Sequence, residues 1–95
     1  DSFTITVATC LEDLGFCRKG EAAQFVGGGR IGLGGELPLN TAGGLLSEGY
    51  IHGWNLIAEG VRQIRGTSTA QVADVEFSLV TSCWGAPTSA VILSR

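Results

Sequence analysis

The sequence predicts a small α/β unit in which helices pack on a short mixed or antiparallel sheet. With 95 residues, the chain has room for one domain at most, residues 1–95. Apolar side chains recur at helical spacing over residues 53–65, and apolar, β-branched runs occupy residues 75–82 and 88–93. Between residues 27 and 60 lie 11 of the 15 glycines, so we expect an extensive loop surface there.

Two helices are expected in the first third of the chain. Apolar residues at positions 3, 5 and 7 alternate as in a strand, whereas those at 7, 11 and 14 have the spacing of a helix. Ser2 can cap a helix and Gly15 would end either element; we favour a helix over residues 3–14. A short helix over residues 20–26 should then end at the glycines 27–29.

The central helix, residues 53–65, has the pattern of an amphipathic helix. Its apolar residues are spaced i, i+3, i+7 and i+10, and polar residues such as Asn55 and Glu59 occupy other positions. Arg62 and Arg65 lie in the last turn, where positive charge favours the helix dipole, and Gly66 follows. The two strands after it carry near-continuous apolar runs, which is typical of a sheet covered on its faces.

The composition is more apolar than a small independent domain needs. Hydrophobic residues make up 44% of the chain and charged residues 16%, with a mean hydropathy of +0.29. Because small chains bury proportionally less surface, we expect some apolar side chains to face another chain or an absent part of the protein. The chain begins at Asp1 and contains no methionine, which fits a processed product or a fragment.

Charge and cysteine usage argue against several classes of protein. The net charge is −3 and the basic residues are scattered, which disfavours a nucleic-acid partner. No apolar stretch approaches the ~20 residues of a membrane span. The 3 cysteines form no CxxC pair and there is 1 histidine, so we expect free thiols, a cytoplasmic setting and no metal site.

A glycine-rich stretch at residues 27–32, GGGRIG, formally fits the dinucleotide-binding pattern GxGxxG. That pattern needs a strand before it and a helix after it. Here a helix is expected before it and Pro38 follows soon after, so a mobile loop is the better interpretation.

The loop that enters the central helix is the strongest candidate site. Residues 40–53, NTAGGLLSEGYIHG, include the chain's only tyrosine, Tyr50, and its only histidine, His52. Backbone N–H groups at a helix start favour an anion or a developing oxyanion, and imidazole exchanges protons near neutral pH. A phenol can donate a proton to an alkoxide or enolate. The alternative is a solvated pair of loop residues without chemistry.

The cysteines divide into one candidate and two structural residues. Cys83 stands at a predicted strand end before a Trp-Gly turn, where it is either a buried inert thiol or an acid/base group or nucleophile. We interpret Cys10 and Cys17 as structural.

Three segments together resemble a known family. Residues 40–44, 47–53 and 63–66 (NTAGG, SEGYIHG and QIRG) resemble the C-terminal half of thiolases, above all the sterol-carrier-protein and lipid-transfer-protein branch. In that family an Asn-x-x-Gly-Gly stretch leads to a Gly-His-Pro-x-Gly loop and a helix ending in Gln-Leu-Arg-Gly. Residues 1–4, DSFT, are similar to the end of the family's Asn-Glu-Ala-Phe element. The resemblance covers essentially the whole chain and is specific over residues 40–66.

The resemblance implies an altered catalytic loop. Tyr50 takes the place of the family's catalytic histidine, and His52 falls on a variable position. A tyrosine would poorly fill that histidine's roles in activating a nucleophilic cysteine and in the oxyanion hole. Thiolase-like steroid aldolases carry a Tyr in this loop, cleave a β-hydroxyacyl-CoA side chain by a retro-aldol step and work with a small OB-fold partner. The implied acid/base is therefore Tyr50, assisted by Cys83 or His52.

The remaining implications concern binding and assembly. Cys83 falls where thiolases have a Cys-x-Gly acid/base element, and contacts to substrate or CoA are implied at Asn40, Gly43, Gly44, Gly49, Gly53 and Gly85. The implied activity is that of a carbon–carbon lyase (retro-aldolase) or an acetyl-CoA acyltransferase. The implied substrate is an acyl-CoA or steroid-CoA thioester, without a covalently bound cofactor. Because the family's nucleophilic cysteine belongs to the N-terminal half, we expect this chain to be inactive alone, and to need that half or to form a homodimer. The competing hypothesis is a non-enzymatic module that associates through exposed apolar surface or binds lipid or acyl chains.

Overall fold

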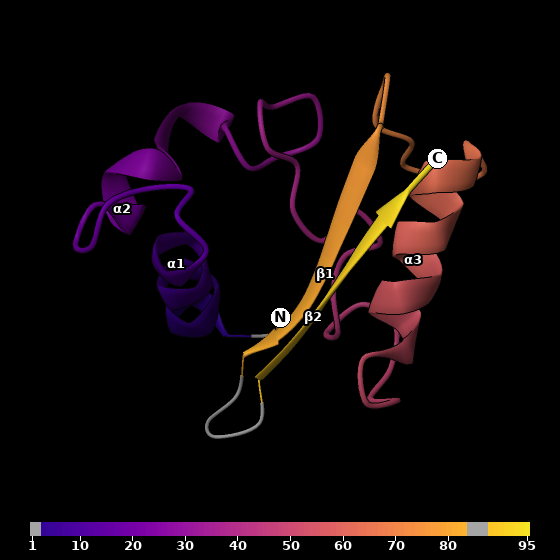
Figure 1. The fold of residues 1–95 in the computed structure, drawn as a ribbon, viewed down its shortest axis with the longest axis horizontal. Helices are drawn as coiled ribbons and strands as arrows, with labels where there is room; N and C mark the ends of the chain where they lie inside the picture. The colour runs from indigo at the N-terminus through magenta and orange to yellow at the C-terminus, as the bar shows by residue number, and fades with distance from the viewer. Residues whose placement is uncertain (1–2, 84–87) are drawn as a thin grey trace.

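The structure, a computed structural model, describes residues 3–83 and 88–95 and places α1 and α2 on one side of a β-hairpin and α3 on the other (Figure 1). The elements, in order, are α1 (Thr4–Asp13), α2 (Ala22–Phe25), the 3₁₀ turn η1 (Gly27–Gly29), α3 (Trp54–Arg65), β1 (Phe77–Cys83) and β2 (Thr88–Ser94). The predicted α/β class with helices packed on a small sheet is confirmed, and the sheet is antiparallel.

The first two helices lie against each other and are joined by one side chain. α1 covers the predicted segment apart from its end residues, and the predicted cap Ser2 lies outside the described residues. Glu12 Oε1 accepts the backbone N–H groups of Gly20 (2.9 Å) and Ala22 (3.2 Å). A carboxylate from α1 thereby accepts from two backbone donors at and just before the start of α2, where no local side chain caps the helix.

The hairpin pairs β1 with β2 in a register that runs from Phe77 opposite Ser94 to Cys83 opposite Thr88. α3 lies on one face of it, and Gly60 makes this approach possible. A Cβ on Gly60 would stand 3.0 Å from both Leu93 Cδ1 and Val80 Cγ2, so a larger residue would push the helix off the sheet.

The other face of the hairpin is exposed among the described residues, so these residues cover only one face of the predicted sheet. Leu79 and Ile92 are cross-strand partners on that face and are 39% and 69% exposed. An open cavity of about 600 Å³ lies between this face of the hairpin and α1, and Leu11 and Leu14 are among its apolar lining residues. The apolar runs are therefore consistent with a sheet whose second layer is supplied by other residues.

The buried side of α3 is mainly polar, which the amphipathic pattern did not predict. Asn55, Glu59 and Gln63 are buried together with Gly60, whereas Trp54 from the apolar stripe is 68% exposed. Two constraints explain the reversal. The helix must turn Gly60 toward the sheet, and Glu59 and Gln63 then meet hydrogen-bonding partners in nearby loops. The buried side-chain amide of Asn55 has no hydrogen-bond partner among the described residues.

The apolar core of the described residues is small. Leu11 and Ala22 are their buried hydrophobic side chains, while many large ones, including Phe3, Ile5 and Phe77, remain exposed. This agrees with the expected surplus of apolar surface. Within the described part, no helix is both long enough and apolar enough to span a membrane.

Candidate functional site

A sharp backbone reversal delivers the candidate loop to the start of α3. His52 and Gly53 have φ angles of 54° and 80°, so two consecutive residues adopt the left-handed conformation. The Gly53 carbonyl then accepts the N–H groups of Leu56 (3.0 Å) and Ile57 (3.2 Å), which begins the helix. Glycine suits position 53 because a side chain would be strained at this φ.

The reversal brings the rings of Tyr50 and His52 together at the mouth of the helix. Their ring centroids lie 5.3 Å apart with the planes tilted by 58°, a separation typical of an edge-to-face pair. The Tyr50 side chain is 81% exposed. The phenol and imidazole thus form a solvent-facing pair at the mouth of the helix, accessible to a ligand or to a covering chain.

The glycine pair upstream forms a tight turn of its own. The Gly43 N–H donates to the Asn40 carbonyl at 2.7 Å, and Ser47 Oγ donates to the Gly43 carbonyl at 2.9 Å. Gly43 and Gly44 have φ angles of 90° and 73°, and a Cβ on Gly43 would lie 2.5 Å from Ser47 Oγ. Turn geometry and a close contact therefore require the glycine at 43, and the exposed Asn40 stands at the start of the turn.

The remaining predicted site residues occupy two other places. Gly49, half-buried, directly precedes Tyr50, and its carbonyl accepts the Ile51 N–H at 3.2 Å. Cys83 ends β1. That end of the hairpin and the start of α3 both lie toward the bottom of the molecule in Figure 1. The side chain of Cys83, and Gly85 entirely, lie outside the described residues.

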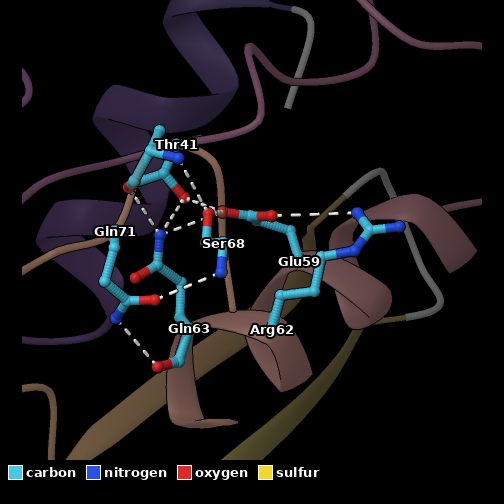
Figure 2. A network of polar contacts seen from close by, with 7 residues as sticks. Thr41, Glu59, Arg62, Gln63, Ser68 and Gln71 are labelled. Carbon is cyan, nitrogen blue, oxygen red and sulfur yellow. Dashed lines mark hydrogen bonds and ion pairs between the residues drawn. The ribbon is translucent and has the colours of Figure 1, made fainter. Parts of the chain in front are cut away.

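A buried polar network behind this loop was not predicted from the sequence (Figure 2). Glu59 Oε1 accepts hydrogen bonds from Ser68 Oγ (2.6 Å), Thr41 Oγ1 (2.7 Å) and Gln63 Nε2 (2.9 Å). Gln63 Nε2 also lies 3.0 Å from Thr41 Oγ1 and 2.8 Å from the Ala70 carbonyl. One carboxylate thus joins α3, the turn at 40–44 and the segment after the helix.

The network favours the ionised form of Glu59. Burial opposes ionisation, but hydrogen bonds from Ser68, Thr41 and Gln63, with the charge of Arg62, outweigh it and lower the pKa of the carboxyl. The Arg62 guanidinium contributes at longer range, 3.8 Å from Glu59 Oε2, and its side chain is half exposed. A charged group is therefore held almost out of contact with water.

Only part of this arrangement leaves a signal in the sequence. Asn55, Glu59 and Gln63 are spaced four residues apart and so share one face of α3. Treating that row as buried would have identified Glu59 and Gln63. Thr41 lies 18 residues before Glu59 and has no local pattern that marks it as a partner.

Comparison with known proteins establishes the family. The family model "Thiolase C-terminal domain-like" matches residues 1–95. The chain belongs to the thiolase C-terminal domain-like family. The earlier resemblance to the C-terminal part of thiolases is confirmed, and its place in the steroid-aldolase-like branch is supported by individual relatives.

Two curated relatives of this thiolase C-terminal domain are named for steroid cleavage. It is 59% identical over 93 residues to the 17-hydroxy-3-oxo-4-pregnene-20-carboxyl-CoA lyase of Mycobacterium tuberculosis, covering 98% of the chain and 24% of the relative. It is 55% identical to a steroid side-chain-cleaving aldolase of Thermomonospora curvata, again covering 98% of the chain and 24% of the relative. The chain therefore spans about a quarter of the length of these relatives.

A solved structure supports the fold as well as the family. The Ltp2-ChsH2(DUF35) aldolase superposes with a TM-score of 0.93 at 54% identity, over 99% of this chain and 25% of that one. The hairpin, α3 and the long glycine-rich segment of this thiolase C-terminal domain thus have the arrangement found in a larger protein. Among the residues that the structure describes, no group of His, Cys, Asp and Glu is placed to hold a metal ion.

Proposed function

We propose that this thiolase C-terminal domain supplies one wall of an active site that cleaves a carbon–carbon bond in a β-hydroxyacyl-CoA, the acyl part being a steroid side chain. The observation that carries the proposal is Tyr50. It stands in the glycine-bounded loop where the family has a histidine, is 81% exposed and lies beside His52. The relatives named as a lyase and an aldolase support the same reaction class.

A phenol at this position suits a retro-aldol step. In that step a base removes the proton of the β-hydroxyl, the Cα–Cβ bond breaks and the β-carbon becomes a carbonyl. The bonding electrons pass to the thioester, whose enolate is then protonated at Cα. Tyr50 acts as the acid/base at the hydroxyl or at the enolate, and His52 or Cys83 assists the proton transfer. No acyl-enzyme forms, so the reaction needs no nucleophilic cysteine.

The turn at 40–44 is the proposed contact for the CoA thioester. Asn40 is exposed at its start, and the left-handed glycines 43 and 44 leave backbone groups free of side chains. Together with Gly49, Gly53 and Gly85, these positions would bind substrate without a covalently attached cofactor. We propose a cytoplasmic protein in which further residues, and an OB-fold partner, complete the site. The similar solved structure, the Ltp2-ChsH2(DUF35) aldolase, supports the presence of a partner.

The test is Tyr50→Phe in the full-length protein that we propose contains this chain. We expect kcat for cleavage of a β-hydroxyacyl-CoA to fall by about 10²-fold or more, the usual contribution of a positioned acid or base. Leu46→Ala is the matched control, because Leu46 is 83% exposed in the same loop and has no proton to exchange. Equal turnover of Tyr50→Phe and the control would rule out the catalytic role of Tyr50.

A second candidate function is association without catalysis. It is favoured by the exposed apolar side chains of the hairpin, where Phe77 and Ile92 are each 69% exposed. A module that pairs with itself through this face would sediment or scatter light as more than a monomer. A module that binds acyl chains there would take up a fluorescent fatty acid. A clean monomer without ligand uptake would remove this alternative.

A further inference from the structure

The buried carboxylate of Glu59 links the proposed substrate turn to the helix that follows Tyr50. Its Oε1 accepts from Thr41 Oγ1 at 2.7 Å, on the turn at 40–44, and from Ser68 Oγ at 2.6 Å, after α3. Glu59 is 8% exposed, so these bonds are shielded from competing water. Figure 2 shows the carboxylate, the hydroxyls and the Gln63 amide converging on one point.

The turn itself is shaped by bonds that do not reach α3. The Gly43 N–H donates to the Asn40 carbonyl, and Ser47 Oγ donates to the Gly43 carbonyl, so both close the segment on itself. Thr41 is different, because its hydroxyl donates to Glu59 and accepts from Gln63 Nε2 at 3.0 Å. The side chain of Thr41 therefore fastens the turn to the helix through both of its hydrogen-bonding functions.

We infer that Glu59 is a positioning residue, whose ionised carboxylate sets through Thr41 where the turn at 40–44 lies relative to α3. Because Tyr50 and His52 lie just before α3, the same contact sets the distance between the thioester-binding turn and the proposed acid/base. The inference rests on the proposed function, in which this turn contacts the CoA thioester.

The chemistry of the contact favours a group that only accepts. An ionised carboxylate offers lone pairs to all of its donors, whereas a protonated acid would place a further hydrogen among them. The Gln63 amide is oriented for the same acceptor. Its Oε1 accepts the Val72 N–H at 3.0 Å, which directs its Nε2 to Glu59 and Thr41. The donors are thus oriented in advance for a negative charge.

Two substitutions separate placement of the turn from general support of the fold. Thr41→Val keeps the shape of the side chain and removes its hydroxyl, so Glu59 loses its link to the turn. Ser68→Ala also removes one hydrogen bond from Glu59 but leaves the turn attached. Thr41→Ser is the conservative variant and retains the hydroxyl. All three would be made in the full-length protein, with amide hydrogen exchange of residues 40–44 and steady-state kinetics on a β-hydroxyacyl-CoA as the readouts.

For Thr41→Val we expect exchange in residues 40–44 to become about tenfold faster and KM to rise about tenfold, the effect of one hydrogen bond to a charged group. We expect kcat to stay within about twofold, because Tyr50 is untouched. Thr41→Ser should restore both values, and Ser68→Ala should change neither.

Unchanged exchange in Thr41→Val, or an equal rise of KM in Ser68→Ala, would overturn the inference. So would faster exchange without any change in KM. If the wild-type protein does not cleave the thioester, the proposed function fails, and with it the substrate role of the turn. The exchange data then still decide by themselves whether Thr41 holds the turn on Glu59.

Discussion

Removing the Glu59 carboxylate is the sharpest test of what stabilises α3 on its neighbouring loops. The variant Glu59→Ala removes the acceptor of three hydrogen bonds. Their donors are Ser68 Oγ (2.6 Å), Thr41 Oγ1 (2.7 Å) and Gln63 Nε2 (2.9 Å). Each hydrogen bond to a charged group contributes about 1.5–3 kcal/mol, but neighbouring bonds are not additive. The full sum is therefore an overestimate, and the fate of each donor decides the cost.

The three donors differ in how easily they find new partners. Ser68 and Thr41 are half-buried, so water can reach their hydroxyls once the carboxylate is gone. Gln63 is only 5% exposed, but its amide retains the Ala70 carbonyl at 2.8 Å. If the net loss equals one to two hydrogen bonds to a charged group, the destabilisation is about 1.5–6 kcal/mol. The ion pair with Arg62, whose side chain is half exposed, adds about 0–1 kcal/mol.

Urea denaturation at pH 7, followed by far-UV circular dichroism, measures this cost. Glu59→Gln is the matched variant, because it keeps a carbonyl acceptor of the same size and should cost only about 1 kcal/mol. Arg62→Ala should change the free energy of unfolding by less than about 1 kcal/mol. If Glu59→Ala cost no more than Arg62→Ala, the network would be a consequence of the fold rather than one of its supports.

Three further predictions concern pH, a glycine and a thiol. Since the folded pKa of Glu59 is lowered, its stabilisation is complete above the unfolded value of about 4.3 and is lost as pH falls through the folded pKa. Glu59→Gln should therefore lose less stability than the wild type as pH falls below about 5, and a parallel decline of the two proteins would contradict this. Gly43→Ala should lower the free energy of unfolding by about 1–3 kcal/mol more than Gly15→Ala does. Both glycines have a left-handed φ, but only a Cβ at position 43 would collide with Ser47. Equal losses would show that the contact with Ser47 relaxes freely. Burial, with the charges of Glu12 and Glu21, raises the pKa of the Cys17 thiol. Alkylation of Cys17 by iodoacetamide should therefore begin at higher pH in the folded chain than in urea. Identical pH profiles of alkylation in the two states would refute this prediction.

Local patterns predicted the elements of this fold well. The residues that form α3 were predicted because periodic apolar residues, terminal arginines and Gly66 all indicate the same helix, and its C-cap at Gly66 is left-handed as expected. The hairpin strands were predicted from their β-branched runs. The short second helix was predicted near its true place, but the glycines after it continue as a 3₁₀ turn.

Long-range packing was the part that the sequence could not supply. The spacing of Trp54 and Ile57 favoured an apolar inner face, yet the close approach of Gly60 to the sheet turned Glu59 and Gln63 inward instead. The partner of Glu59 on the turn, Thr41, lies far away along the chain. Likewise, an apolar run alone could not say which face of the hairpin α3 would cover and which would stay exposed.

The candidate site was predicted in outline. The placement of Tyr50 and His52 at the mouth of α3 follows from local glycine chemistry, and the structure brings the two rings together. The roles of these residues, and those of Cys83 and the binding glycines, remain predictions.

Two reactions of the full-length protein distinguish aldol cleavage from thiolysis. One is cleavage of a β-hydroxyacyl-steroid-CoA without free CoA; the other is thiolysis of the matching β-ketoacyl-CoA with free CoA. A tyrosine in place of the family's histidine predicts cleavage of the first, giving a ketone and a shortened acyl-CoA, and little turnover of the second. Thiolysis that depends on free CoA, without cleavage of the β-hydroxy substrate, would rule out the proposed retro-aldol function.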